Sequence, residues 1–373
     1  MNIVCLSHLR WDFVFQRPQH LLTRAARGGR VLYIEEPVDH PGPARMRVTE
    51  DRSGVQVATP LVPSRIAPTE QREILRQLIG NAITRYAGDS YVLWCYTPMA
   101  TPLLIDLTPS AIVYDCMDEL SAFSGASPEL TTFESVLFEH SDVVFTGGQS
   151  LYEAKRSRHP NIHAFPSSVD VSHFATARSI SRDPDDVRHL PHPRIGFFGV
   201  IDERTDVELI RGVAALEPQW QLVLVGPTAK IDPATLPRAA NIHYLGPKAY
   251  GELPAYLASW DVAMLPFARN DATRFISPTK TPEYLAAGKP VVSTSIRDVV
   301  RPYGERGLVR IADTPEAFVD AIRAALEEDS APRIAAADAF LADMSWDLTW
   351  NRMKQLIEAA CASTPKRAWS RAS

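Results

Sequence analysis

Residues 277–294 read S-P-T-K-T-P-E-Y-L-A-A-G-K-P-V-V-S-T, which is the pattern of a loop, a short helix and a buried strand. Pro282 suits the first turn of a helix, where its missing N–H removes no hydrogen bond, and Thr279 is placed to cap that turn. Gly288 is expected in the conformation that ends a helix, and Pro290 prevents its continuation. The apolar strand that follows is typical of a parallel sheet covered on both faces.

The same alternation of apolar strands and helical segments extends in both directions along the 373 residues. It predicts an α/β protein with two Rossmann-like, doubly wound domains. The alternation stops over residues 175–193, a polar segment with three prolines that is expected to be a linker. The N-terminal domain is therefore assigned to residues 1–174 and the C-terminal domain to residues 194–345. The last helix, about 346–362, is predicted to cross back to the N-terminal domain, with a frayed tail from Ser363.

Composition and charge argue against several classes of protein. With 45% hydrophobic and 22% charged residues the chain has an ordinary globular composition. No apolar run approaches the roughly 18 residues of a membrane-spanning helix. The N-terminus lacks the pattern of a signal peptide, so a cytoplasmic location is expected. A net charge of −5 argues against nucleic-acid binding, and four cysteines without C-x-x-C spacing are predicted to be free thiols.

Two such domains facing one another are expected to bring the carboxyl ends of two sheets to a common cleft, where ligands bind. The start of the helix in 277–294 offers N–H groups and the positive end of its dipole to an anion such as a diphosphate. Lys280, one of seven lysines, opposes that dipole and therefore makes sense beside an anionic ligand. Glu283 lies on the same face, and its carboxylate can accept the two hydroxyls of a ribose. A solvated salt bridge between these two residues is the alternative interpretation.

The run P-x-K-x-x-E-Y-L-A-A-G-K-P-V-V resembles the nucleotide-binding helix of retaining glycosyltransferases of the family 4 type (glycosyl transferases group 1), which have the GT-B fold. Further stretches resemble this family in the same order: F-P-S-S-V-D-V-S-H-F at 165–174, the strand–loop–helix at 195–210, the strands at 222–227 and 241–246, Y-L-A-S-W-D-V-A-M-L-P at 256–266, and S-W-D-L-T-W at 345–350. The resemblance covers nearly all of the second half of the chain and is weaker in the first half.

The resemblance implies a glycosyltransferase of polysaccharide biosynthesis that uses a UDP- or GDP-type sugar donor, with retention and without a metal or other cofactor. The expected acceptor is a hydroxyl of a growing glycan, a lipid-linked saccharide or a small metabolite. A nucleotide-sugar epimerase and a non-catalytic nucleotide-sugar-binding protein are the alternatives. A modest arginine bias in the N-terminal domain permits weak peripheral contact with a membrane, although a solvated helix face explains it as well.

The sequence departs from the family's pattern around the donor. Phe275 stands where the family has a glutamate that contacts the donor sugar. The candidates for that contact are Asn270, Asp271 or the backbone N–H groups of Ile276 and Ser277. Val200 replaces the usual phosphate-binding arginine, which leaves Arg204 as the diphosphate candidate of its loop. An ion pair of Arg204 within this charged loop is the alternative.

The N-terminal domain lacks the family's glycine-rich loop and has S-H-L-R-W-D-F-V-F-Q-R-P at residues 7–18 instead. Arg17 stands directly before a proline that marks a helix start, and Arg10 is the competing candidate for a diphosphate. Trp11 is a candidate for contact with the diphosphate or the acceptor. The alternative is an aromatic plug, with Arg17 paired to an acidic neighbour.

Two acidic residues follow a central strand in V-Y-D-C-M-D-E-L, residues 113–120. Met117 occupies the position of a histidine in many relatives, and Asp118 is preferred over Asp115 as the catalytic acid. Asp118 would be the general base if the enzyme inverts, while a helix cap is its structural alternative. Lys280 is the third catalytic candidate, because its ammonium would stabilise the departing diphosphate.

Overall fold

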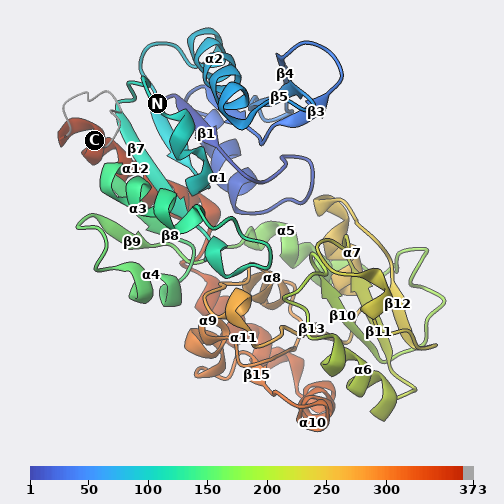
Figure 1. The fold of residues 1–373 in the computed structure, drawn as a ribbon. Coiled ribbons are helices and arrows are strands. Elements are labelled where there is room, and N and C mark those ends of the chain that lie inside the picture. The colour runs from blue at the N-terminus through green and yellow to red at the C-terminus, as the bar shows by residue number, and fades with distance from the viewer. Residues whose placement is uncertain (364–373) are drawn as a thin grey trace. The chain divides into compact units, whose positions relative to one another are not determined.

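The computed structural model describes residues 1–363, so the frayed tail predicted beyond that point lies outside the described residues. The chain divides into two compact units, each of which is an α/β domain (Figure 1). Unit 1 comprises residues 1–121 and 125–166 together with the segment that starts at Trp346, and unit 2 comprises 122–124 and 167–345. The chain therefore passes from unit 1 to unit 2 at residue 167, eight residues before the predicted linker.

The sheet of unit 1 has nine strands, and only the pairing of β4 with β5 is antiparallel. The strands are β1 (Ile3–Leu6), β2 (Val31–Ile34), β3 (Val38–His40), β4 (Arg45–Glu50), β5 (Gln56–Pro63), β6 (Val92–Cys95), β7 (Ala111–Cys116), β8 (Val143–Thr146) and β9 (Ile162–Ala164). The order β3-β5-β2-β1-β6-β7-β8-β9 reverses its direction between β1 and β6, where open sheets of this kind bind ligands.

Helices cover both faces of this sheet. The helix α1 (Arg17–Ala26) packs with α12 (Trp346–Ser363), and the Trp346 ring stacks on His20 at 4.5 Å. The other face carries α2 (Pro68–Tyr86), α3 (Leu130–His140) and the 3-10 helix η1 (Pro98–Leu103), while α4 (Gln149–Lys155) precedes β9. The C-terminal helix thus lies in unit 1, as predicted (Figure 1).

Two parts of unit 1 differ from the sequence analysis. The strands β3 to β5 were not predicted, because β4 is largely exposed and charged and because prolines interrupt the apolar alternation of β5. The sequence of residues 99–107 has a helix-like pattern, but the structure has only the shorter η1 there, since Pro102 lies inside it and does not allow an α-helix to continue. The cysteines are free, and Cys5, Cys95 and Cys116 are buried in the strands.

Unit 2 is built on six parallel strands in the order β12-β11-β10-β13-β14-β15. The strands are β10 (Arg194–Phe198), β11 (Gln221–Val225), β12 (Ile242–Tyr244), β13 (Val262–Leu265), β14 (Val291–Ser293) and β15 (Arg310–Ile311). The helices are α5 (Val171–Ala175), α6 (Val207–Leu216), α7 (Leu253–Ala258), α8 (Lys280–Ala286), α9 (Arg297–Val299), α10 (Pro315–Glu327) and α11 (Ser330–Leu341). The switch point of this sheet lies between β10 and β13.

The segment predicted as a linker, 175–193, is part of unit 2. Its apolar residues Ala177, Val187 and Leu190 are buried in the core around α8. The Arg194 guanidinium, also buried, donates hydrogen bonds to the Leu190 carbonyl and thereby fixes the end of the segment. The burial of these three residues was not predicted, because widely spaced apolar residues in a polar segment show no helical or strand period.

Candidate functional site

The helix α8 is fixed to the carboxyl end of β10 by a buried tyrosine. The backbone N–H of Phe198 donates to the Tyr284 hydroxyl at 2.9 Å, and the two rings meet edge to face at 4.9 Å. At the other end of α8, Arg178 donates to the Ala286 carbonyl at 2.9 Å. Tyr284 was not predicted to position the helix, although its place beside Glu283 on a buried helix is a recognisable signal. These contacts fix the residues at the start of α8.

Lys280 extends along the backbone that leaves β10. A Cβ atom added to Gly199 would lie 2.1 Å from Lys280 Cε and 2.9 Å from Nζ, so a side chain at this position would force Lys280 to shift. Gly199 has a φ of +149°, which also favours glycine. On the next strand, a Cβ atom on Gly226 would lie 1.9 Å from the Gly199 carbonyl oxygen. The Lys280 ammonium therefore lies at the switch-point edge of the sheet, 6.0 Å from the centroid of the Phe197 ring.

Glu283 lies one turn further along α8 and is only 4% exposed. Burial raises the pKa of its carboxyl to about 7, and the Lys280 ammonium opposes this rise. A salt bridge on a solvated helix face is therefore not what the structure contains, because the carboxyl is withdrawn from water. The predicted cap is also wrong: Thr279 has a helical backbone and its side chain makes no capping hydrogen bond.

The buried carboxyl of Glu283 predicts a pH-dependent stability. Its pKa is raised from an ordinary 4.5 to about 7 in the folded protein, so its stabilising contribution is complete below pH 4.5 and is lost as the pH rises through 7. Above that pH the ionised carboxylate costs on the order of 3 kcal/mol. Glu283→Gln, which resembles the protonated form, should therefore stabilise the ligand-free protein at pH 8.5 and change it little at pH 4.5. Urea denaturation at both pH values measures this difference.

The control for this experiment is Glu327→Gln, which removes a carboxylate from an exposed position of α10. This variant should have the same free energy of unfolding as the wild type at both pH values. Equal stabilities of Glu283→Gln and wild type at pH 8.5 would contradict the raised pKa. The same Glu283→Gln protein should bind a nucleoside diphosphate at least about tenfold more weakly, because an amide oxygen replaces a carboxylate fork.

The other donor-site candidates are engaged within unit 2. The Arg204 Nε lies 3.0 Å from Asp202 Oδ1 and its Nη2 lies 2.6 Å from Oδ2, so the guanidinium is paired inside its own loop. The Ile276 N–H donates to the Thr273 carbonyl at 3.4 Å. At Ser277 the bonds involve other atoms than the predicted N–H: its carbonyl accepts the Ser167 hydroxyl at 2.6 Å, and its hydroxyl accepts the Ser167 N–H at 3.4 Å. The ion-pair interpretation of Arg204 accounts for its geometry.

The loop after β10 is fastened to the loop after β13. The Asp206 N–H donates to the Pro266 carbonyl and the Ala268 N–H donates to the Arg204 carbonyl, both at 2.8 Å. The Asn270 side-chain amide also donates to the Glu203 carbonyl at 3.0 Å. These bonds explain the unusual D-E-R-T-D loop as a fixed structural connection.

In unit 1, Arg17 and Asp115 form a buried ion pair. The Arg17 Nε lies 3.1 and 3.0 Å from the two Asp115 oxygens, and Nη2 lies 2.9 Å from Oδ1. A third donor, Nη1, reaches the Phe165 carbonyl at 2.8 Å. Burial raises the pKa of Asp115, while the adjacent guanidinium counteracts the rise. The interpretation of Arg17 as a diphosphate ligand is therefore replaced by its alternative, an arginine paired with an acid.

Arg10 and Trp11 are likewise held by a neighbouring loop. The Trp11 ring is buried against Tyr33 at 4.9 Å, and the Trp11 backbone N–H donates to Glu35 Oε1 at 2.8 Å. Arg10 donates to Glu35 Oε2 at 3.2 Å and to the Glu36 carbonyl at 2.6 Å. Trp11 is thus a core residue, while Phe13 and Phe15, the aromatics that follow it, are exposed.

Asp118 follows β7 in a half-buried loop, where its carbonyl accepts a hydrogen bond from the Cys116 thiol at 3.6 Å. The next residue, Glu119, pairs with the buried Lys155 at 2.8 Å, and Lys155 also pairs with Glu134 at 2.6 Å. This buried cluster anchors the loop to α4 and α3. A 3-10 helix, η2 (Leu120–Ala122), begins two residues after Asp118, so Asp118 is not the residue that caps it.

Within residues 1–363, no three His, Cys, Asp or Glu side chains are grouped so as to hold a metal ion. The same residues contain no helix that is both long and apolar enough to span a bilayer.

Comparisons with known proteins agree with this fold. Residues 192–328 match the family model described as Glycosyl transferases group 1. The putative teichuronic acid biosynthesis glycosyltransferase TuaH of Bacillus subtilis (strain 168) is 27% identical over 226 residues, which cover 56% of each chain. The match therefore spans little more than half the length of that relative. The resemblance to this family, stated from the sequence, is confirmed.

Two solved structures share the fold over nearly the whole chain. Sucrose-phosphate synthase from Thermosynechococcus elongatus has a TM-score of 0.71 at 16% identity and covers 97% of this chain and 100% of its own. The UDP-forming α,α-trehalose-phosphate synthase from Burkholderia vietnamiensis has a TM-score of 0.68 at 13% identity, with 96% and 99% covered. At such identities the likeness shows the fold, which is GT-B as predicted.

Proposed function

We propose that this chain, which has the GT-B fold and carries a glycosyl transferases group 1 domain at residues 192–328, transfers a sugar from a nucleotide diphosphate sugar to a hydroxyl acceptor. The observation that supports this most strongly is the contact between Lys280 and Gly199. It places an ammonium at the switch point of the unit 2 sheet, one helical turn from the buried Glu283. In this arrangement the cation suits the diphosphate of a nucleotide sugar, and the carboxylate suits the hydroxyls of its ribose.

Lys280 would act on the departing group. When the anomeric C–O bond of the donor breaks, negative charge accumulates on the terminal phosphate of the nucleotide, and an adjacent ammonium stabilises it. Arg204 contributes less, because Asp202 already neutralises its guanidinium. Glu283 would accept the ribose hydroxyls in its ionised form, so nucleotide affinity should rise as the pH passes through about 7.

The proton of the acceptor hydroxyl must also be removed. We propose retention, which the family resemblance supports, with the departing phosphate accepting that proton on the same face of the sugar. Asp118, on its anchored loop in unit 1, is the general base if the reaction inverts instead. We also propose a metal-independent reaction, in which the Lys280 ammonium provides the positive charge at the phosphate.

The names of the similar proteins indicate which substrates to test first. The Bacillus subtilis relative is named for teichuronic acid biosynthesis, which supports a saccharide acceptor. The structural neighbour is described as UDP-forming, which makes UDP-sugars the first donors to test.

Mass spectrometry of donor sugars incubated with the protein tests the proposal. We expect release of UDP or GDP from one donor of a panel of UDP- and GDP-sugars, slowly with water and faster with a crude glycan extract. The reaction should continue in EDTA. Binding without release would identify a non-catalytic binding protein, and an isomerised sugar still attached to its diphosphate would identify an epimerase. Either outcome contradicts the transferase.

A further inference from the structure

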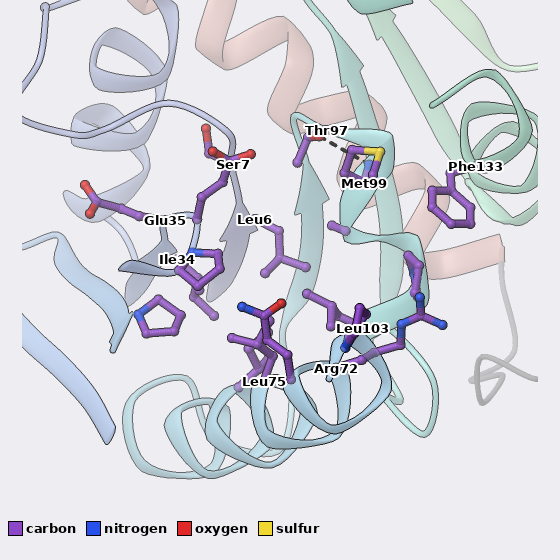
Figure 2. A pocket seen from close by; sticks show the side chains of 18 of the residues that line it. Leu6, Ser7, Ile34, Glu35, Arg72, Leu75, Thr97, Met99, Leu103 and Phe133 are labelled. Atoms are coloured by element: carbon purple, nitrogen blue, oxygen red, sulfur yellow. Dashed lines mark hydrogen bonds between the residues drawn. The ribbon is translucent and has the colours of Figure 1, made fainter. Parts of the chain in front are cut away.

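Unit 1 contains a cavity of about 400 Å³ between its sheet and α2, which we name the α2 pocket. It opens beside the carboxyl ends of β1, β2 and β6, which is the switch point of this sheet. Figure 2 shows Leu6, Ile34, Leu75 and Leu103 around one hollow, with Phe133 at its far side. This volume is within the range of pockets that hold small molecules.

Most of the wall of the α2 pocket is apolar. Four of its lining residues are prolines, Pro37, Pro60, Pro68 and Pro102, and proline has no backbone N–H. The Thr97 hydroxyl accepts the N–H of Met99 at 3.2 Å, so this polar pair is internal to the wall (Figure 2). The polar lining residues are Ser7, Gln71, Arg72, Thr97 and three glutamates, and the remaining twelve are apolar, so a hydrocarbon or aromatic group suits most of this wall.

Charge around the α2 pocket also selects its ligand. The lining residues include three carboxylates, Glu35, Glu36 and Glu129, against one guanidinium, Arg72. The Glu35 oxygens already accept hydrogen bonds from the Trp11 backbone N–H and the Thr59 hydroxyl, at 2.8 and 2.9 Å, and Glu35 also pairs with Arg10 at 3.2 Å. With Arg10 counted, the charge around the pocket is still negative. An anionic headgroup would meet repulsion at this site, whereas a neutral apolar group would not.

We infer that the α2 pocket binds the neutral hydrocarbon or aromatic part of the acceptor. The pocket follows β6, and the next strand in the sheet, β7, leads directly to the loop of Asp118, so both lie at the same edge of the unit 1 sheet. The assignment of the ligand as part of an acceptor rests on the proposed function. The binding of a neutral apolar group does not depend on it.

Binding is measured with N-phenyl-1-naphthylamine, a neutral apolar dye whose fluorescence rises when it leaves water. The wild-type protein should bind it, and decanol should displace it at least about tenfold more effectively than decanoate. Ala100→Phe, which fills the pocket, should weaken dye binding at least tenfold, while Ala359→Phe on the exposed side of α12 should leave it unchanged. Leu103→Gln should weaken dye binding as well, whereas Leu103→Met should not. This pair distinguishes an effect of side-chain polarity from a general effect of substitution on folding.

Three results would overturn the assignment. They are no dye binding by the wild type, dye binding by Ala100→Phe and Leu103→Gln as tight as that of the wild type, or displacement by decanoate as effective as by decanol. Transfer to alkyl glucosides from butyl to decyl tests the acceptor role. The KM of the wild type should fall at least tenfold along this series, and the fall should vanish in Ala100→Phe. A wild-type KM that does not change with chain length would overturn the acceptor role. Intact dye binding without any sugar transfer would overturn the proposed function and leave the neutral ligand in place.

Discussion

Lys280→Met should lower kcat/KM for the sugar donor about 100- to 1,000-fold. Methionine keeps much of the length of the side chain along Gly199 but removes the charge that is proposed to stabilise the departing phosphate. Loss of one such stabilising group lowers the rate of an enzyme by about 100- to 1,000-fold. The affinity for UDP, measured by isothermal titration calorimetry, should fall together with the rate. Lys354→Met, on α12 in unit 1, is the matched control and should leave both values unchanged.

Gly199→Ala tests the same cation without removing it. The new methyl group would occupy the position 2.1 Å from Lys280 Cε, so the Lys280 side chain must shift from its place along Gly199. Nucleotide affinity should fall nearly as far as in Lys280→Met. Gly251→Ala is the control, because a Cβ atom there meets nothing within 4 Å. Unchanged affinity in both Lys280→Met and Gly199→Ala would place the donor elsewhere on the protein.

Arg17→Met should destabilise unit 1 by about 3–5 kcal/mol in urea denaturation followed by tryptophan fluorescence. The variant leaves the Asp115 carboxyl, which is 0% exposed, without its counter-charge. The loss should grow as the pH rises, because a lone buried carboxyl is tolerated only in its protonated form. Arg17→Met combined with Asp115→Leu should recover most of the stability, since apolar residues replace buried ion pairs at little cost.

The control for Arg17→Met is Arg27→Met on the same helix. Arg27 pairs with Asp347 at 2.9 Å, but both side chains are more than half exposed, so at most about 1 kcal/mol should be lost. Unaltered stability of Arg17→Met together with weaker nucleotide binding would restore Arg17 as a ligand of the diphosphate.

Much of the candidate site was predictable because it is encoded locally. Lys280 and Glu283 are three residues apart on one helix, and the glycine and proline that end this helix are its immediate neighbours. The residues that fix this helix were not predictable in the same way. The Tyr284 hydroxyl bonds to Phe198, 86 positions away, and the Gly199 that faces Lys280 is equally remote.

The candidates of unit 1 illustrate the opposite case. An arginine before a helix and two acids after a strand suggest ligand contacts as readily as an ion pair. Arg17 and Asp115 lie 98 positions apart, and only the packing of α1 across the sheet shows that each satisfies the other. Trp11 was equally ambiguous, because an aromatic residue in a loop is assigned to the core or to the surface by its neighbours in space.

The sequence by itself determined the alternation of strands and helices, the return of the last helix to unit 1, and the lysine and glutamate of α8. Each of these depends on a local period or a short motif. The tertiary structure alone decided which charges neutralise one another, that residues 175–193 belong to the core of unit 2, and where the α2 pocket lies. The physical reason is that burial and charge pairing are set by residues far apart in the chain, whose meeting no local pattern records.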